Sequence, residues 1–138
     1  MTRDTGAERS LSFLLARAGF QSVRRLRERL VPYGVDPRQF ALLHELALES
    51  GRSQQALADA IGVPKSGMVQ LVDDLEARGM LERRRGDRRT HALHLTGAGA
   101  DFLRETAGVA LEHDAELAAP LSSAERTRLV ALLAKLAR

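Results

Sequence analysis

The densest positive charge in the sequence surrounds a glycine, in the segment RRRGDRRTHALHLTGAG at residues 83–99. Between Arg78 and Arg89 there are six arginines and only two acids, Glu82 and Asp87, which leaves a local excess of four positive charges. A guanidinium group makes planar, paired contacts with phosphate and with the guanine edge. This arginine cluster is therefore a candidate contact site for nucleic acid.

The four histidines do not form a set that predicts catalysis or metal binding. His44 lacks a second histidine at the metalloprotease spacing, and His91 and His94 should point to opposite faces of a strand. We expect His113 to be solvated on an acidic helix surface. His44 follows Phe40 on an apolar helix face, where a hydrogen-bonded core histidine is favoured over a ligand contact. We predict no enzyme, no metal and no cofactor.

Composition limits the class of protein further. The chain has 138 residues, is 44% hydrophobic and has a net charge of +3, which suits one domain with a core of its own. It contains no cysteine, so disulfides and thiolate metal sites are excluded. Neither a signal peptide nor an apolar run near the length of a membrane span is present. We expect a cytoplasmic protein without a membrane segment.

Residues 53–78 have the spacing of a helix-turn-helix. A first helix begins at Ser53 and ends at Gly62, and a second begins at Pro64 and runs to about Arg78. The second helix has a buried stripe and an opposite face that points outward. The stripe consists of Met68, Leu71, Val72 and Leu75, and the outward face of Ser66, Gln70, Asp73 and Ala77. Such a unit presents its last helix to a DNA major groove.

The arginine cluster follows this unit as a predicted β-hairpin. Residues 80–85 and 90–96 read as strands around a turn at 86–87, with Leu93 and Leu95 packed on the helices. A hairpin in this place makes the unit a winged helix, whose tip reaches the minor groove. Asp87 is expected to pair with Arg89 and hold it extended. The competing interpretation is a solvated charged turn.

Further helices are predicted outside residues 53–96. One is predicted at 10–30, after Asp36 another begins with a capping box to Gln39, and a long one runs from Thr96 to about 118. Pro120 ends it, and a second capping box opens the last helix. Leucines keep helical spacing there at 129, 132, 133 and 136.

The segments GVDPRQFALLHELA, SQQALADAIGVPKSGMVQLVDDLEARGML, DRRTHALHLTGAG and LSSAERTRLVALLAKL together resemble the MarR family of bacterial transcription regulators. The most specific pieces are the D-x-R of the wing (Asp87, Arg89) and the L-T-x-x-G that follows it (Leu95, Thr96, Gly99). The resemblance covers about residues 10–137. It implies a homodimer joined through its terminal helices, which binds a pseudopalindromic operator, commonly as a repressor released by small aromatic or phenolic ligands.

Spacing and resemblance together predict a single domain over residues 1–138, mainly α-helical with a small β-hairpin wing. Dimerisation helices are expected at 10–32 and 97–137, and the winged helix-turn-helix DNA-binding region at 36–96. The partners implied are double-stranded DNA, a second copy of the chain and a small-molecule effector. The alternative function is a winged-helix protein-interaction module without specific DNA binding.

The predicted site residues form three groups. The recognition-helix group is Lys65, Ser66, Gly67, Val69 and Gln70. The wing group is Arg85, Asp87, Arg88 and Arg89. The candidate effector pocket is Arg17, Phe20, Phe40 and His44. Lys65 and Ser66 are expected to contact phosphate and Gln70 to read adenine, whereas Gly67 and Val69 replace the hydroxyl residues that the family usually has there.

Overall fold

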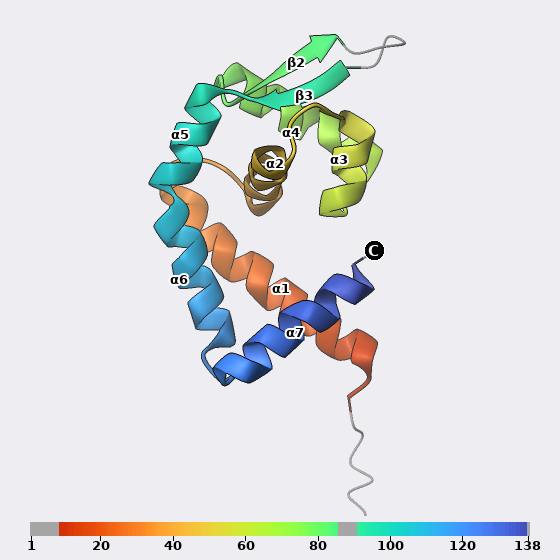
Figure 1. Ribbon diagram of the computed structural model, residues 1–138, viewed down its shortest axis with the longest axis vertical. Helices are drawn as coiled ribbons and strands as arrows, with labels where there is room; N and C mark the ends of the chain where they lie inside the picture. The colour runs from red at the N-terminus through yellow and green to blue at the C-terminus, as the bar shows by residue number, and fades with distance from the viewer. Residues whose placement is uncertain (1–8, 86–90, 138) are drawn as a thin grey trace, which may run out of the picture. The chain divides into compact units, whose positions relative to one another are not determined.

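The computed structural model of the chain describes residues 9–85 and 91–137 (Figure 1). Its elements are α1 (Leu11–Leu30), the 3-10 turn η1 (Val31–Tyr33), α2 (Pro37–Leu48), β1 (Arg52–Ser53), α3 (Gln54–Ile61), α4 (Lys65–Ala77), β2 (Leu81–Arg85), β3 (His91–Leu95), α5 (Gly97–Glu105), α6 (Ala107–Ala118) and α7 (Ser123–Leu136). The predicted class, mainly α with a small β-hairpin and a winged helix-turn-helix, is confirmed. Two compact units divide the chain: Leu30–Leu111, and the described parts of Met1–Arg29 and Glu112–Arg138.

The helix starts predicted from local sequence are confirmed. At the start of α2, the backbone N–H groups of Arg38 and Gln39 donate to the Asp36 carboxylate, and Gln39 Oε1 accepts from the Asp36 N–H. Ser53 caps α3 with a single bond, in which its hydroxyl oxygen accepts from the Ala56 N–H at 3.1 Å, and Gly62 ends the helix in the left-handed conformation with φ +71°. These contacts satisfy the N–H and C=O groups that helix ends leave unpaired. The turn before α4 is thus set by local chemistry.

A leucine-rich core orients α4 within the Leu30–Leu111 unit. Fully buried side chains come from α2, α3, α4 and both strands of the hairpin. They include Leu42, Leu43, Leu46, Leu57, Met68, Val72, Leu75, Leu81 and Leu93. Each such burial contributes roughly 1.5–3 kcal/mol. Because the buried stripe of α4 faces this core, the opposite face of α4 is exposed.

The hairpin is part of a three-stranded antiparallel sheet in the order β1-β3-β2. Leu93 pairs with Arg83 of β2 on one side and with Arg52 of β1 on the other. The sequence did not predict β1, because two residues are too short to show alternation. Leu93 is buried as expected, whereas Leu95 is only half-buried. The predicted turn at 86–87 lies outside the described residues.

The single helix predicted from residue 97 to 118 is wrong, because the chain forms two helices that meet at Thr106. Thr106 is fully buried, and its hydroxyl donates to the carbonyl of Phe102 at 2.8 Å. Such a bond to the preceding turn competes with regular helical hydrogen bonding and bends helices. Apolar periodicity continues through the break and therefore did not reveal it.

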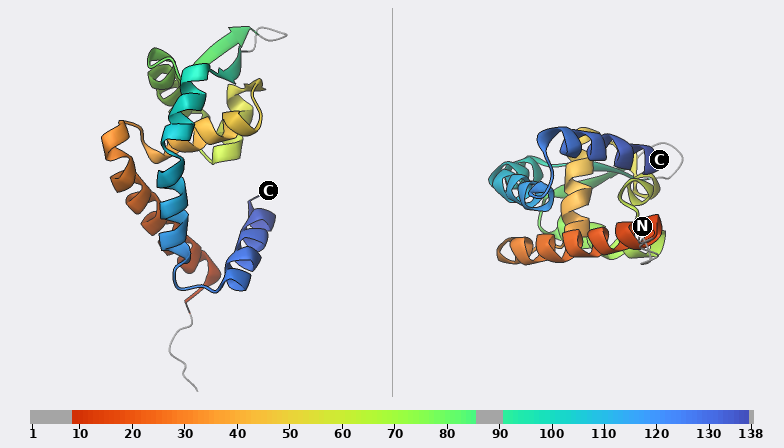
Figure 2. Two further views of the ribbon diagram at one scale, coloured as in Figure 1. Left: turned by 60° about the vertical axis from the view of Figure 1, so that its left-hand side comes forward. Right: turned by 90° about the horizontal axis from the view of Figure 1, so that it is seen from below.

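In the other unit, the part of α6 from Glu112 onward lies beside α1 (Figure 2). The prediction that His113 is solvated is wrong: its side chain is only 5% exposed, and Nε2 lies 3.2 Å from Ser22 Oγ. Arg29 also contacts Glu112, at 3.1 Å, and Glu116. The polar face of α6 is thus directed at α1, which the charge pattern of α6 alone did not indicate.

Candidate nucleic-acid interface

The outward face of α4 carries most of the residues predicted to read DNA. Lys65, Ser66, Val69 and Gln70 are exposed. Gly67 is half-buried, and a Cβ at this position would lie 3.1 Å from Val63 Cγ1. Gly67 therefore lets the first turn of α4 pack against the preceding turn. That the four exposed side chains contact DNA stays a prediction.

The first turn of α4 has features that suit a phosphate group. Pro64 precedes the helix and makes no side-chain cap, so the N–H groups of Lys65 and Ser66 keep free hydrogen-bonding capacity, whereas that of Gly67 donates to the Pro64 carbonyl at 2.8 Å. Lys65 and Ser66 add a positive charge and a hydroxyl at the same end. Because the helix dipole is positive here, an anion is favoured.

Gln70 and Asp74 form a pair on the exposed face, where Gln70 Nε2 donates to Asp74 Oδ1 at 2.7 Å. The bond restrains the amide and leaves its oxygen and second N–H free. These two groups match the N6 and N7 positions of adenine. Val69, half exposed beside them, suits the methyl group of thymine.

The arginines of the cluster are used differently from one another. Among the four that the structure describes, Arg78 donates to the carbonyls of Tyr33 and Gly34 at 3.0 and 2.9 Å and lies 5.8 Å from the Phe102 ring centre. Arg84 donates to Glu82 at 2.7 Å. The positive charge counted from the sequence is thus partly engaged within the protein.

Arg83 joins β2 to α4. Its Nη2 lies 2.5 Å from Asp73 Oδ1 and its Nη1 2.6 Å from Glu76 Oε1. The hydrogen bond with Asp73, followed by the nearby charge of Glu76, raises the pKa of Arg83 against the opposing effect of burial. Sequence reasoning missed this cluster. Two acids three residues apart on one helix, seven to ten residues before an arginine, were its signal.

Only the root of the wing is described. Arg85 is exposed at the end of β2. Asp87, Arg88 and Arg89 lie outside the described residues, so their roles and the Asp87–Arg89 pair stay predictions.

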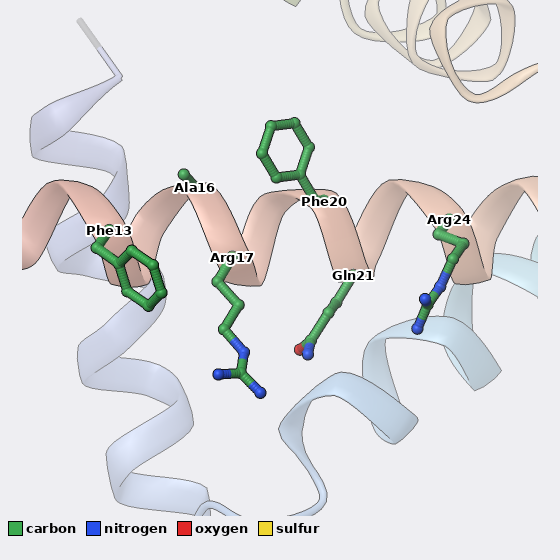
Figure 3. A pocket seen from close by; sticks show the side chains of 6 residues that line it. All are labelled: Phe13, Ala16, Arg17, Phe20, Gln21 and Arg24. Carbon is green, nitrogen blue, oxygen red and sulfur yellow. The ribbon is translucent and has the colours of Figure 1, made fainter. Parts of the chain in front are cut away.

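The four predicted effector residues fall into two pairs. Arg17 and Phe20 lie on α1 and line a hollow of about 450 Å³ together with Phe13, Ala16, Gln21 and Arg24 (Figure 3). Phe40 and His44 lie on α2 in the other compact unit, with ring centres 4.5 Å apart. A pocket that combines both pairs stays a prediction.

A metal site and a membrane span each need features that can be sought in the parts of the chain at 9–85 and 91–137. There, no group of three histidine, aspartate or glutamate side chains is arranged to hold a metal ion. Among the same residues, no helix has the length and apolar character needed to span a membrane.

Known proteins resemble the chain in sequence and in structure. The sequence model of the MarR family matches residues 33–90. A Thauera aromatica protein described as a transcriptional regulatory protein for the hcr operon is 37% identical over 107 residues, which are 76% of this chain and 64% of that protein. The chain thus spans under two thirds of this curated relative.

Two solved structures are similar over almost the whole chain. The transcriptional repressor CouR, bound to a 23-mer DNA duplex, is 30% identical with a TM-score of 0.84, covering 100% of this chain and 99% of that one. A MarR family protein of Mycobacterium tuberculosis in complex with p-aminosalicylic acid is 25% identical with a TM-score of 0.78, covering 94% and 100%.

Proposed function

Because the chain belongs to the MarR family of DNA-binding transcription regulators, we propose that it is a homodimeric repressor of a pseudopalindromic operator, released by a small aromatic ligand. The observation that carries this proposal is the exposed face of α4, with Lys65, Ser66, Val69 and Gln70 held outward by a fully buried opposite stripe. The similarity to CouR, which is bound to DNA, supports it.

A second copy of the chain is the proposed cover for α1 and α7. No residue of α7, which the structure describes completely, is buried. Exposed large apolar side chains gather on α7 and at the start of α1, in the same compact unit. They are Leu11, Phe13, Leu14, Leu15, Leu129, Val130, Leu132, Leu133 and Leu136. Such a surface is unusual for a monomer and suits a two-fold interface, where one patch meets its own copy.

A dimer defines what the operator should look like. Two copies of α4 in successive major grooves read half-sites about 10 bp apart. Lys65 and Ser66 would hold phosphate, and Gln70 with Val69 would read an adenine or thymine. Arg85, Arg88 and Arg89 would reach the adjacent minor groove or its phosphates.

The ligand proposed for release is an aromatic acid or phenol. On α1, Arg17 supplies a positive charge to the hollow, and Phe20, which is 77% exposed, supplies an aromatic ring to its lining. A guanidinium and aromatic rings that line one hollow suit an aromatic carboxylate or phenolate. The complex of the similar M. tuberculosis protein with p-aminosalicylic acid supports this ligand class.

The alternative, a winged helix that binds only proteins, is not favoured. Acidic charge on the outward face of α4, at Asp73 and Asp74, would favour that alternative. Asp73 is bound by Arg83 and Asp74 by Gln70, so neither carboxylate stands alone on that face.

The test is an electrophoretic or anisotropy titration of the full chain with the DNA that flanks its own gene. We expect tighter binding than to a shuffled duplex of equal length and composition. The logarithm of affinity should fall against the logarithm of salt concentration with a slope of about −0.9 per phosphate neutralised. Salicylate is the probe for release. Equal affinity for both duplexes, or a flat salt response, would contradict operator binding.

A further inference from the structure

Arg83 is the one described arginine of the cluster that binds the recognition helix through acidic side chains. Its two terminal nitrogens bind Asp73 and Glu76, and its backbone N–H donates to the second oxygen of Glu76 at 3.0 Å. The backbone and the side chain of Arg83 thus both bind the carboxylate of Glu76. This triple contact fixes the middle of β2 against the second half of α4.

We infer that Arg83 is a positioning residue for DNA recognition: it holds the root of the wing on the recognition helix and keeps two carboxylates from repelling the phosphate backbone. The inference rests on the proposed DNA-binding function and adds to it. Arg83 acts through Asp73 and Glu76, without itself contacting DNA.

Exposure separates Arg83 from its neighbour. The Arg83 side chain is 23% exposed and has an acid on each terminal nitrogen. The Arg84 side chain is 59% exposed and, among the residues that the structure describes, pairs with Glu82, two residues away on the same strand. A planar guanidinium can bridge two carboxylates at once, which a lysine ammonium does with poorer geometry. Position 83 is therefore suited to an arginine that binds both carboxylates of α4. Arg84 is a matched control with the same charge.

Charge gives the second part of the inference. The side chains of Asp73 and Glu76 are 49% and 39% exposed, on the helix that would enter the groove. Without Arg83 they would present two negative charges within a Debye length, about 10 Å at 0.1 M salt, of the phosphates. Arg83 lowers that local charge from −2 to −1 and turns both carboxylates toward β2.

The experiment is a mutant cycle measured by DNA binding. The variants are Arg83→Ala, Asp73→Asn with Glu76→Gln, all three changes together, and Arg84→Ala as the control. We expect Arg83→Ala to weaken promoter binding about tenfold or more and Arg84→Ala to weaken it less. Replacing Asp73 and Glu76 should then raise the DNA affinity of the Arg83→Ala variant. This gain should exceed the effect of the same two replacements on the wild type by at least about threefold.

Each outcome decides the inference. If Arg83 instead contacted phosphate, removing the two acids would change DNA affinity equally, within about threefold, in the wild type and in Arg83→Ala. The Arg83→Ala variant would also show a salt dependence of affinity that is smaller by about one ion. Either result overturns the positioning role. If the alanine variant is unstable, Arg83→Lys replaces it, because lysine keeps the positive charge. Weaker DNA binding by Arg83→Lys with an unchanged salt slope supports the positioning role. DNA binding as tight as that of the wild type overturns it.

A DNA-free cycle separates failure of this inference from failure of the proposed function. The same variants are unfolded in urea, and Arg83 should be coupled to the two acids by about fivefold or more in the unfolding equilibrium constant. Smaller coupling overturns the inference even where the wild type binds its promoter. If the wild type binds promoter and shuffled DNA equally, the proposed function fails instead, whatever the unfolding cycle shows.

Discussion

The charge state of His113 depends on the packing of α1 against α6. Burial lowers the pKa of its imidazole below the ordinary value of 6.5, with Arg29 and Arg25 acting in the same direction and Asp114 and Glu116 opposing them. The hydrogen bond with Ser22 is available to the neutral ring. The folded protein therefore favours neutral His113.

This shift predicts a pH dependence of stability. Because the folded-state pKa is depressed, the unfolded chain takes up a proton first as the pH falls below about 6.5, and the free energy of unfolding decreases. One such group contributes at most about 1.4 kcal/mol per pH unit. We expect His113→Gln to show a smaller loss between pH 7.5 and pH 5.5 than the wild type, measured by urea unfolding.

The exposed His91 is the control for that measurement. His91→Gln should retain the wild-type loss of stability over the same pH range, since this side chain lies at the solvent-facing start of β3. An identical pH dependence in wild type and His113→Gln would contradict the assignment to His113.

At the residue scale, the sequence predicted what is local. The capping boxes at Asp36 and Ser122 were read correctly, because each partner lies three residues from its cap. His113 was misread, because Ser22 is 91 residues away. Arg83 was counted only as positive charge, because the spacing of the two acids before it indicates an ion pair only once β2 is known to turn back along α4.

Gly99 determines how one element joins another, since it lets α5 begin against the start of β2. A Cβ on Gly99 would lie 2.1 Å from the Met80 carbonyl oxygen and 2.6 Å from Leu95 Cδ1. Thr96 caps the same helix by accepting from the Gly99 N–H at 3.1 Å, and its hydroxyl donates to the Gly79 carbonyl at 2.5 Å. The L-T-x-x-G motif thus marks the place where α5 packs closely against the start of β2.

We predict that Gly99→Ala lowers the free energy of unfolding by about 2–3 kcal/mol, because the methyl group meets a backbone carbonyl that cannot rotate away. Gly97→Ala is the matched control, since a Cβ there has no neighbour within 4 Å among the described residues. Its change should stay within about 0.5 kcal/mol. Equal losses in urea unfolding of the two variants would refute this view of the junction.

Helices with strong caps and a clear apolar stripe were predictable to within a few residues, as α1 to α4 and α7 show. The two failures have tertiary causes. β1 exists because Arg52 and Ser53 meet β3, which is remote in sequence. The break between α5 and α6 follows from the burial of Thr106. Neither cause leaves a periodic signal.

At the scale of the whole molecule, the proposed dimer is tested through α7. We predict that Leu133→Asp converts the protein to a monomer and weakens promoter binding at least tenfold, because a charge in an apolar interface is desolvated without a partner. Light scattering coupled to size exclusion measures the mass, and circular dichroism checks that the helices remain.

Leu48→Asp is the control for the dimer test. It places the same charge at a leucine that is 81% exposed on α2 and lies outside the α1 and α7 surface. This variant should keep the wild-type mass. A wild type of monomer mass, or a dimeric Leu133→Asp variant, would show that α7 does not form the interface. No sequence pattern distinguishes a helix face covered by the same chain from one covered by a second copy. The prediction of a homodimer therefore came from the family resemblance alone.

The middle position of β3 has a mechanical consequence for the wing. Besides its pairing with β2, the Leu93 carbonyl accepts from the Gly51 N–H at 2.8 Å, and the Leu95 N–H donates to Ser50 Oγ at 3.1 Å. A strand that is hydrogen-bonded along both edges resists displacement. If the wing enters a groove as proposed, the duplex would adapt more readily than this strand where their widths differ. Base steps that flex easily would gain an advantage even at positions no side chain touches.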